Sequence, residues 1–107
     1  MISSKTGSGT VIDSLISGGC ILEGAHIERS VLSPNVKVNN KAEIKNSVIM
    51  EGVIIGENAK IKNAIIDKQV VIPPNTHIGH NFENDKKHYV LTTSGIVIVP
   101  KRAVVTP

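Results

Sequence analysis

A repeat of 17 residues constrains what this chain can fold into more than any other feature. The stretches 15–31, 32–48, 49–65 and 66–82 align without gaps and agree column by column in residue type. Three columns are aliphatic throughout: Leu15, Leu32, Ile49 and Ile66; Ile21, Val38, Ile55 and Ile72; Ile27, Ile44, Ile61 and Ile78. Units this short cannot bury an apolar face alone, so they must stack, and a fixed short period predicts a solenoid.

The pattern inside each unit predicts strands. Val36 and Val38 flank Lys37, and small-then-large pairs such as Ala42 and Ile44 recur around a charged residue. Alternation with period two is typical of strands, and 17 residues are too few for two helices with turns. Three inward pairs per unit predict three short strands per coil. The fold class is therefore all-β, a parallel β-helix shaped as a triangular prism of about four coils, and the 2% aromatic content suits its narrow interior.

Turn-forming residues and composition set the predicted boundaries. Residues 1–11 are rich in Ser, Gly and Thr and predict a flexible lead-in, and residues 12–80 hold the β-helix. Residues 81–107 predict an irregular segment followed by a capping strand or hairpin that packs on the prism, with no helix. Two columns of corner residues are predicted: Gly18, Asn35 and Gly52; Gly24, Asn58 and Asn75.

Composition excludes several classes of protein. The net charge of +3 is spread along the chain without a basic, aromatic-interleaved run, which argues against nucleic-acid binding. The single cysteine, Cys20, excludes an internal disulfide and a cysteine-based zinc site. The apolar runs are too short for a membrane span and no signal peptide is visible, so a cytoplasmic location without membrane contact is expected.

The residue pattern predicts no catalytic residue, cofactor site or metal site. His26 and His77 share a column three coils apart, about 14 Å at normal strand spacing, which is too far to share a metal. His77 and His80 can meet only across a corner. Ser30 and Ser47 are followed in their column by Ala64, which indicates a small inward position rather than a nucleophile.

The outward columns predict surface ion pairs and a partner surface. Charged columns that favour ion pairs between coils are His26, Glu43 and Lys60, and Glu28, Lys45 and Lys62. Apolar outward columns that favour burial against a partner are Val31, Val48 and Ile65, and Cys20, Ile54 and Val71. In this chain alone, a homo-oligomer is the expected way to cover them.

Four motifs in order carry a family resemblance. They are SLISGGCILEGAHIERSVLSPNVKVN (14–39), NSVIM (46–50), AIIDKQVVIPPNTHIG (64–79) and SGIVIVPK (94–101). Together they resemble the C-terminal domain of glucose-1-phosphate adenylyltransferase, the ADP-glucose pyrophosphorylase of glycogen and starch synthesis. The resemblance implies a left-handed parallel β-helix that follows a nucleotidyltransferase domain in a tetrameric enzyme. That missing domain would use Mg²⁺ to convert ATP and glucose 1-phosphate to ADP-glucose and pyrophosphate, so this chain should not be catalytic alone.

The same resemblance implies an assembly and regulatory role, with a site for a phosphorylated metabolite. Lys68 in IDKQVVIP and Lys101 after GIVIVP match basic positions of the family's effector site, where ammonium groups can neutralise phosphate. Arg102 is a possible addition, whereas Val105 stands where many bacterial members have another basic residue. The alternative for Lys68 and Lys101 is that they are ordinary surface lysines. Three alternatives concern the whole chain: a domain of a non-catalytic regulatory paralogue, a hexapeptide-repeat acyltransferase that uses a histidine of a neighbouring subunit, or a purely structural oligomerisation module.

Overall fold

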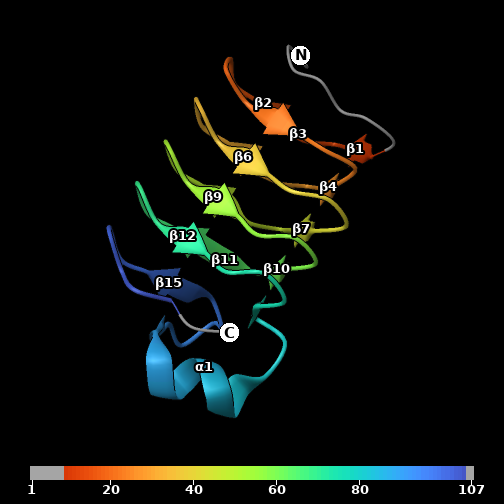
Figure 1. Ribbon diagram of the computed structural model, residues 1–107. Coiled ribbons are helices and arrows are strands. Elements are labelled where there is room, and N and C mark those ends of the chain that lie inside the picture. The colour runs from red at the N-terminus through yellow and green to blue at the C-terminus, as the bar shows by residue number, and fades with distance from the viewer. Residues whose placement is uncertain (1–8, 106–107) are drawn as a thin grey trace.

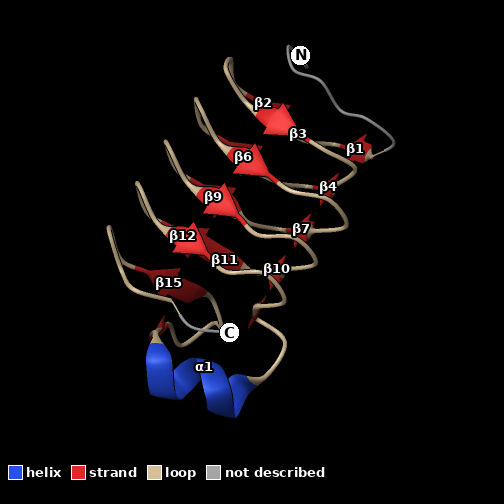
Figure 2. Ribbon diagram, viewed as in Figure 1, coloured by secondary structure: helices blue, strands red, loops and turns tan. Residues whose placement is uncertain are grey.

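The chain winds around a triangular prism whose three faces are parallel sheets, as the computed structural model shows for residues 9–105 (Figures 1 and 2). The molecule is longest along one axis, with extents of 35 × 22 × 22 Å. Successive coils therefore stack along one direction, and the predicted parallel β-helix of about four coils is confirmed.

From β1 to β13 the strands go to the three sheets in strict rotation, and β14 and β15 both join sheet B. Sheet A contains β1 (Thr10–Ile12), β4 (His26–Glu28), β7 (Glu43–Lys45), β10 (Lys60–Lys62) and β13 (His77–Ile78). Sheet B contains β2 (Leu15–Ile16), β5 (Val31–Leu32), β8 (Val48–Ile49), β11 (Ala64–Ile66), β15 (Val97–Val99) and, antiparallel to β15, β14 (Val90–Leu91). Sheet C contains β3 (Ile21–Leu22), β6 (Lys37–Val38), β9 (Ile54–Ile55) and β12 (Val71–Ile72).

The core consists of aliphatic ladders that run along the prism axis. Ile27, Ile44, Ile61 and Ile78 are at most 1% exposed, and they stand in register on sheet A. Branched aliphatic side chains pack well at strand spacing, so one such residue per face and coil fills the interior without aromatics.

The first coil departs from the predicted alignment by one residue. Ile16 and Leu22 point inward in register with Leu32 and Val38, whereas the predicted Leu15 is 66% exposed. The reason is a shorter corner: only four residues separate Leu22 from Ile27, and the later coils have five at this place. Ile21 was predicted to point into the core and Cys20 to face outward, but Cys20 is buried and Ile21 is exposed. The same shorter corner explains this exchange.

Left-handed backbone turns the chain at the corners of the prism. Most residues with positive φ form three columns: Gly19, Asn35, Gly52, Gln69 and Arg102; Gly24, Lys41, Asn58 and Asn75; Asp13, Arg29, Asn46 and Asn63. The first column corrects the predicted Gly18 to Gly19, which again reflects the shift in the first coil. Glycine and asparagine dominate these positions because they adopt positive φ at low cost.

Serine hydroxyls join neighbouring coils at the corner between sheets A and B. The Ser30 hydroxyl accepts a hydrogen bond from the Ser47 backbone N–H (3.1 Å) and donates to the Glu28 carbonyl (2.9 Å). The Ser47 hydroxyl likewise accepts from the Ala64 N–H (3.2 Å). Both serines are 3% exposed. The predicted inward position of this column is confirmed, and the hydroxyls satisfy buried backbone donors.

The segment after β13 leaves the prism and then rejoins it. It contains α1 (Phe82–His88) and β14, after which β15 pairs with β11 and places Val97 and Val99 in the core. The predicted packing of a strand on the prism is confirmed, but the prediction of no helix is wrong. The missed signal is Asn81, whose side chain caps α1 by accepting from the Asn84 N–H.

The described start of the chain also differs from the prediction. Thr10 and Val11 were placed in the lead-in, but they belong to β1, which pairs with β4. Residues 1–8 lie outside the described part of the chain.

Gly56, whose φ is not positive, is expected to tolerate a side chain poorly because the backbone of the next coil lies too close. A methyl group there would lie 2.5 Å from the Pro74 nitrogen and 2.7 Å from the Ile72 carbonyl oxygen, both on the backbone of the next coil. Gly56→Ala should therefore destabilise the protein by about 1–3 kcal/mol, the usual range for overpacking. Gly18→Ala is the matched control, because nothing lies within 4 Å of its added methyl. Chemical denaturation of both variants tests this, and equal stabilities would contradict it.

Candidate functional site

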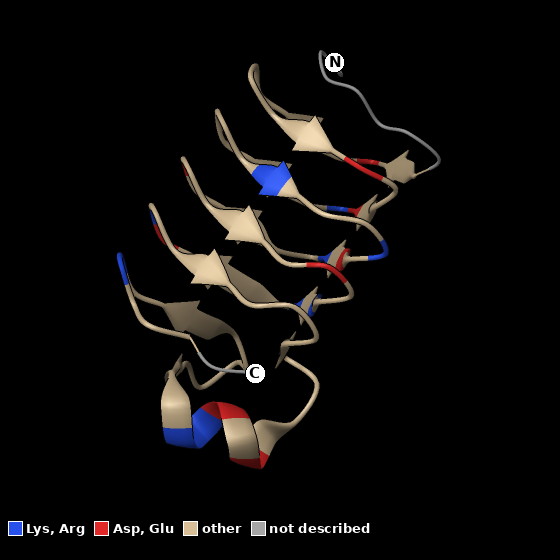
Figure 3. Cartoon of the chain, in the orientation of Figure 1, with Lys and Arg blue, Asp and Glu red and all other residues tan. Residues whose placement is uncertain are grey.

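The structure brings Lys68 and Lys101 together on adjacent coils at the corner between sheets B and C. Because Ile66 pairs with Val99, the two following turns stack, and the Arg102 N–H donates to the Lys68 carbonyl at 3.3 Å. The two lysines are 33 positions apart in the chain. Only the return of β15 to the prism makes them neighbours, as the blue corner after β15 in Figure 3 illustrates.

We call the five residues of this corner, Asp67, Lys68, Gln69, Lys101 and Arg102, the basic corner. Gln69 and Arg102 hold the same left-handed conformation, with φ of 58° and 59°. The Arg102 Nε donates to the Gln69 Oε1 at 3.2 Å. The Lys68 Nζ lies 3.6 Å from the Asp67 Oδ1, and its side chain is 51% exposed. Three cations and one carboxylate therefore lie at the surface on two stacked turns.

The pKa of Asp67 in the basic corner lies below its ordinary value. The Lys68 backbone N–H donates to its Oδ1, and this hydrogen bond is the main reason that the pKa of Asp67 lies below its ordinary value. The charges of Lys68 and Lys101 lower the pKa further. Asp67 therefore stays ionised and holds the first turn of the corner, while the net charge of the cluster remains positive. The sequence prediction did not include Asp67 or Gln69 in the site. Their positions on either side of Lys68, in a run of three polar residues at a predicted corner, were the signal that could have identified them.

Two shallow hollows flank the basic corner. One, of about 280 Å³, is lined by Asn35, Glu51, Gly52, Lys68 and Gln69. The other, of about 340 Å³, extends past Arg102 toward Val71, Pro73 and the residues 103–105. Val105 itself is buried in the core. Position 105 thus packs with the core and at the same time borders the second hollow.

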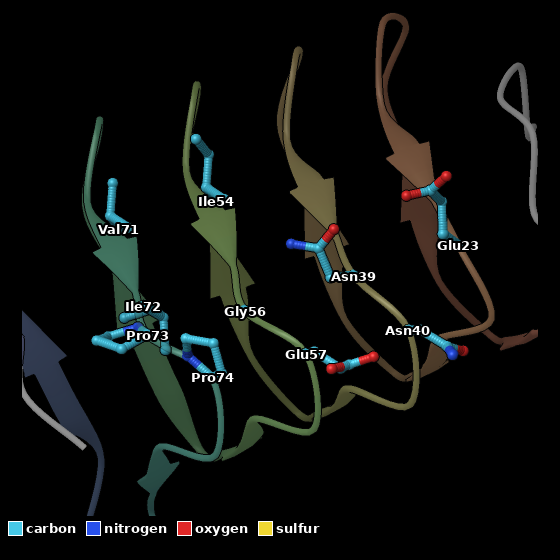
Figure 4. Close-up of a pocket in the computed structure, with 10 residues that line it drawn as sticks. All are labelled: Glu23, Asn39, Asn40, Ile54, Gly56, Glu57, Val71, Ile72, Pro73 and Pro74. Carbon is cyan, nitrogen blue, oxygen red and sulfur yellow. The ribbon is translucent and has the colours of Figure 1, made fainter.

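A separate groove crosses sheet C (Figure 4). It has a volume of about 490 Å³ and is lined by Glu23, Asn39, Asn40, Ile54, Gly56, Glu57, Val71, Ile72, Pro73 and Pro74. Its floor is aliphatic and its polar groups are carboxylates and amides. The residues that line the groove include no Ser, Thr, Cys, Lys or His.

The outward columns of sheet A form ion pairs and ring contacts on the surface of the prism. The predicted register of His26, Glu43, Lys60 and His77 is confirmed, and the Lys60 Nζ bonds the Glu43 Oε2 at 3.0 Å between coils. Glu28 differs from the prediction, because it pairs with His26 (3.0 Å) and Arg29 (2.7 Å) of its own coil. The ring centroids of His77 and His80 lie 5.9 Å apart. Within residues 9–105, no three His, Cys, Asp or Glu side chains are grouped closely enough to hold a metal ion.

Comparison with known proteins identifies the chain's family. Residues 1–99 match the family described as GlmU-like, C-terminal hexapeptide. This chain belongs to that hexapeptide-repeat family. The short period, the corner residues and the three parallel sheets are the features of this chain that agree with the assignment.

Among similar proteins, this hexapeptide domain matches several named glucose-1-phosphate adenylyltransferase. One from Anaeromyxobacter dehalogenans (strain 2CP-C) is 69% identical over 93 residues, or 87% of this chain. Others from Anaeromyxobacter sp. (strain Fw109-5) and Methylococcus capsulatus are each 46% identical, over 92% and 85% of this chain. The domain spans only 22–24% of the length of these relatives. The one helix among residues 9–105 is too short to cross a membrane.

Proposed function

We propose that this domain is the regulatory and assembly part of a glucose-1-phosphate adenylyltransferase, and that its basic corner binds a phosphorylated metabolite. One observation carries the proposal: Lys68 and Lys101, far apart in the chain, stack at one corner with Arg102 beside them. Charged donors on a rigid turn favour phosphate oxygens. The relatives with this name support the choice of enzyme.

In this proposal the reaction itself lies outside the domain. ATP and glucose 1-phosphate would be converted to ADP-glucose and pyrophosphate, with Mg²⁺, by the part of the longer protein that this chain does not span. The domain contributes effector binding and contacts between subunits, and no residue of it acts on the substrates. A cytoplasmic location belongs to the same proposal.

The outer face of sheet B supports the assembly role. Its outward column is aliphatic on all six strands, from Leu15 and Val31 through Val48, Ile65 and Ile98 to Val90. Leu15 is 66% exposed and Val90 57%. An uncharged stripe of this length favours contact with another protein surface. We propose that the remainder of the enzyme or a neighbouring subunit covers it.

Effector binding is tested by calorimetry with fructose 1,6-bisphosphate as the probe. We expect the double variant Lys68→Ala/Lys101→Ala to bind at least tenfold more weakly than the unmodified domain, because two charge-assisted contacts are lost. The double variant Lys37→Ala/Lys41→Ala is the matched control, since it removes the same charge on strand β6 and at another corner. If both double variants lose the same affinity, the attraction is non-specific and the assignment of the basic corner is wrong.

A further inference from the structure

The C-terminal end of sheet A leaves backbone donors without a next coil. Along the sheet, each coil donates N–H groups to carbonyls of the following coil: Thr10 to Ala25, His26 to Ala42, Glu43 to Ala59 and Lys60 to Thr76, at 2.8–2.9 Å. β13 is the last strand of this sheet. A buried donor without a partner is costly, so the end of the sheet needs an acceptor from elsewhere.

Asp85 supplies that acceptor. Its Oδ2 accepts from the Gly79 N–H at 3.0 Å, so a side chain takes the place of a carbonyl from a further coil. Asp85 is 2% exposed and is the buried residue of α1. Phe82 on the same helix is 59% exposed. The Asp85 carboxyl group therefore hydrogen-bonds the helix to the prism, and Tyr89 and Leu91, which follow the helix, pack against the core.

When the Asp85 carboxyl group is ionised, one of its two buried oxygens lacks a hydrogen-bond donor in the described part of the chain. The Oδ1 of Asp85 is buried and has no hydrogen-bond partner among residues 9–105. Burial raises the pKa of Asp85, while the Gly79 N–H and the nearby His80 and His88 oppose the rise. Burial, together with His77 and Lys62, lowers the pKa of His80, so that ring gives little positive charge near neutral pH. Tyr89 also lies near Asp85, but a tyrosine side chain carries no positive charge that could stabilise the carboxylate.

We propose that α1 and β14 form a cap on the C-terminal end of the solenoid, and that ionisation of Asp85 weakens its closure. A neutral carboxyl group fits the buried position, whereas a carboxylate with one unpaired oxygen gains by moving into water. Because α1 buries no other residue, this movement would take the helix with it and release the Gly79 N–H.

The direction with pH follows from the raised pKa of Asp85. A carboxyl group whose pKa is higher in the closed state contributes fully to closure below its ordinary pKa of 3.8. That contribution is lost as the pH rises through the raised value. The cap should therefore be tighter in mild acid than at neutral pH.

Amide hydrogen exchange measured by NMR between pH 4 and 8 tests the cap. After correction for the intrinsic exchange rate, we expect protection of the Gly79 amide to fall tenfold or more with rising pH in the unmodified protein. Asp85→Asn should abolish this fall, because its amide oxygen still accepts from Gly79 and cannot ionise. His77, His80 and His88 are present in both proteins, so the difference reports the carboxyl group alone.

Two controls complete the test. The Asn63 amide, which donates to the Lys45 carbonyl inside the solenoid, should show no such fall and reports global unfolding. Asp13→Asn removes an exposed carboxyl group at the other end of the solenoid and should keep the behaviour of the unmodified protein. An equal pH dependence of Gly79 protection in the unmodified and Asp85→Asn proteins would overturn the proposal, as would full protection of Gly79 in Asp85→Ala.

Discussion

Ending the chain after His80 is expected to abolish cooperative folding and to leave a protein that aggregates. The truncation removes Val97, Val99 and Val105 from the core and uncovers the apolar side of β11. Burying a valine contributes about 1.5–3 kcal/mol, so the three together contribute about 5–9 kcal/mol. That is comparable with the whole stability of a small domain, about 5–15 kcal/mol. Urea denaturation followed by circular dichroism, with sedimentation for aggregates, measures the effect.

A matched variant separates the contribution of β15 and the residues after it from that of α1 and β14. Replacing residues 80–96 with a single Asn would copy the corner Lys62–Asn63–Ala64 and lead Gly79 directly into β15. This variant should keep a cooperative unfolding transition, because Val97 and Val99 stay in place. If the truncated chain is as stable and soluble as the full one, the predicted role of the segment is wrong. If the shortened variant also aggregates and loses its cooperative unfolding transition, then α1 and β14 provide the stability that the truncation removes.

Ile55→Ala is expected to destabilise the protein by about 2–5 kcal/mol, the range for removing a large buried aliphatic side chain. Ile55 is fully buried in β9 between Val38 and Ile72. Ile54 precedes it in the same strand, points outward and is 40% exposed. Ile54→Ala is therefore the control with the same chemistry, and it should cost less than about 1 kcal/mol.

Thermal and urea denaturation of the two isoleucine variants give the comparison. The Ile55→Ala protein should melt roughly 10 °C or more below the unmodified protein, while Ile54→Ala stays within a few degrees. Similar losses for both would mean that the two faces of β9 are not distinguished by burial, contrary to the structure.

The sequence predicted the repeating part of the fold because that part depends on local periodicity. Ile27, Ile44, Ile61 and Ile78 recur at a constant interval, and stacking keeps each of them in register with the next. The prediction failed where the interval changes. A corner one residue shorter before Ile27 shifts the first coil, and in a strand a shift of one residue exchanges the inner and outer faces, as Leu15 and Ile16 show.

The candidate site was only half predictable. The IDKQVVIP and GIVIVP motifs pointed to Lys68 and Lys101 through a family resemblance, but nothing local to either lysine says that they meet. Asp67 and Gln69 were overlooked because their roles depend on the turn they share with Lys68 and on contact with Arg102.

The sequence by itself thus determined the solenoid, its strand pattern and its aliphatic interior, since each coil repeats the same local alternation of inward and outward residues. Only the tertiary structure decided how the repeat ends. The chain leaves the prism after β13, forms α1 and returns as β15, and no periodicity specifies where a returning strand will pair. That return places Lys101 beside Lys68 and Asp85 under Gly79. The repeat places neither pair of residues together. Both contacts arise at the last coil of the solenoid, whose backbone groups need hydrogen-bond partners and whose apolar interior needs a cover.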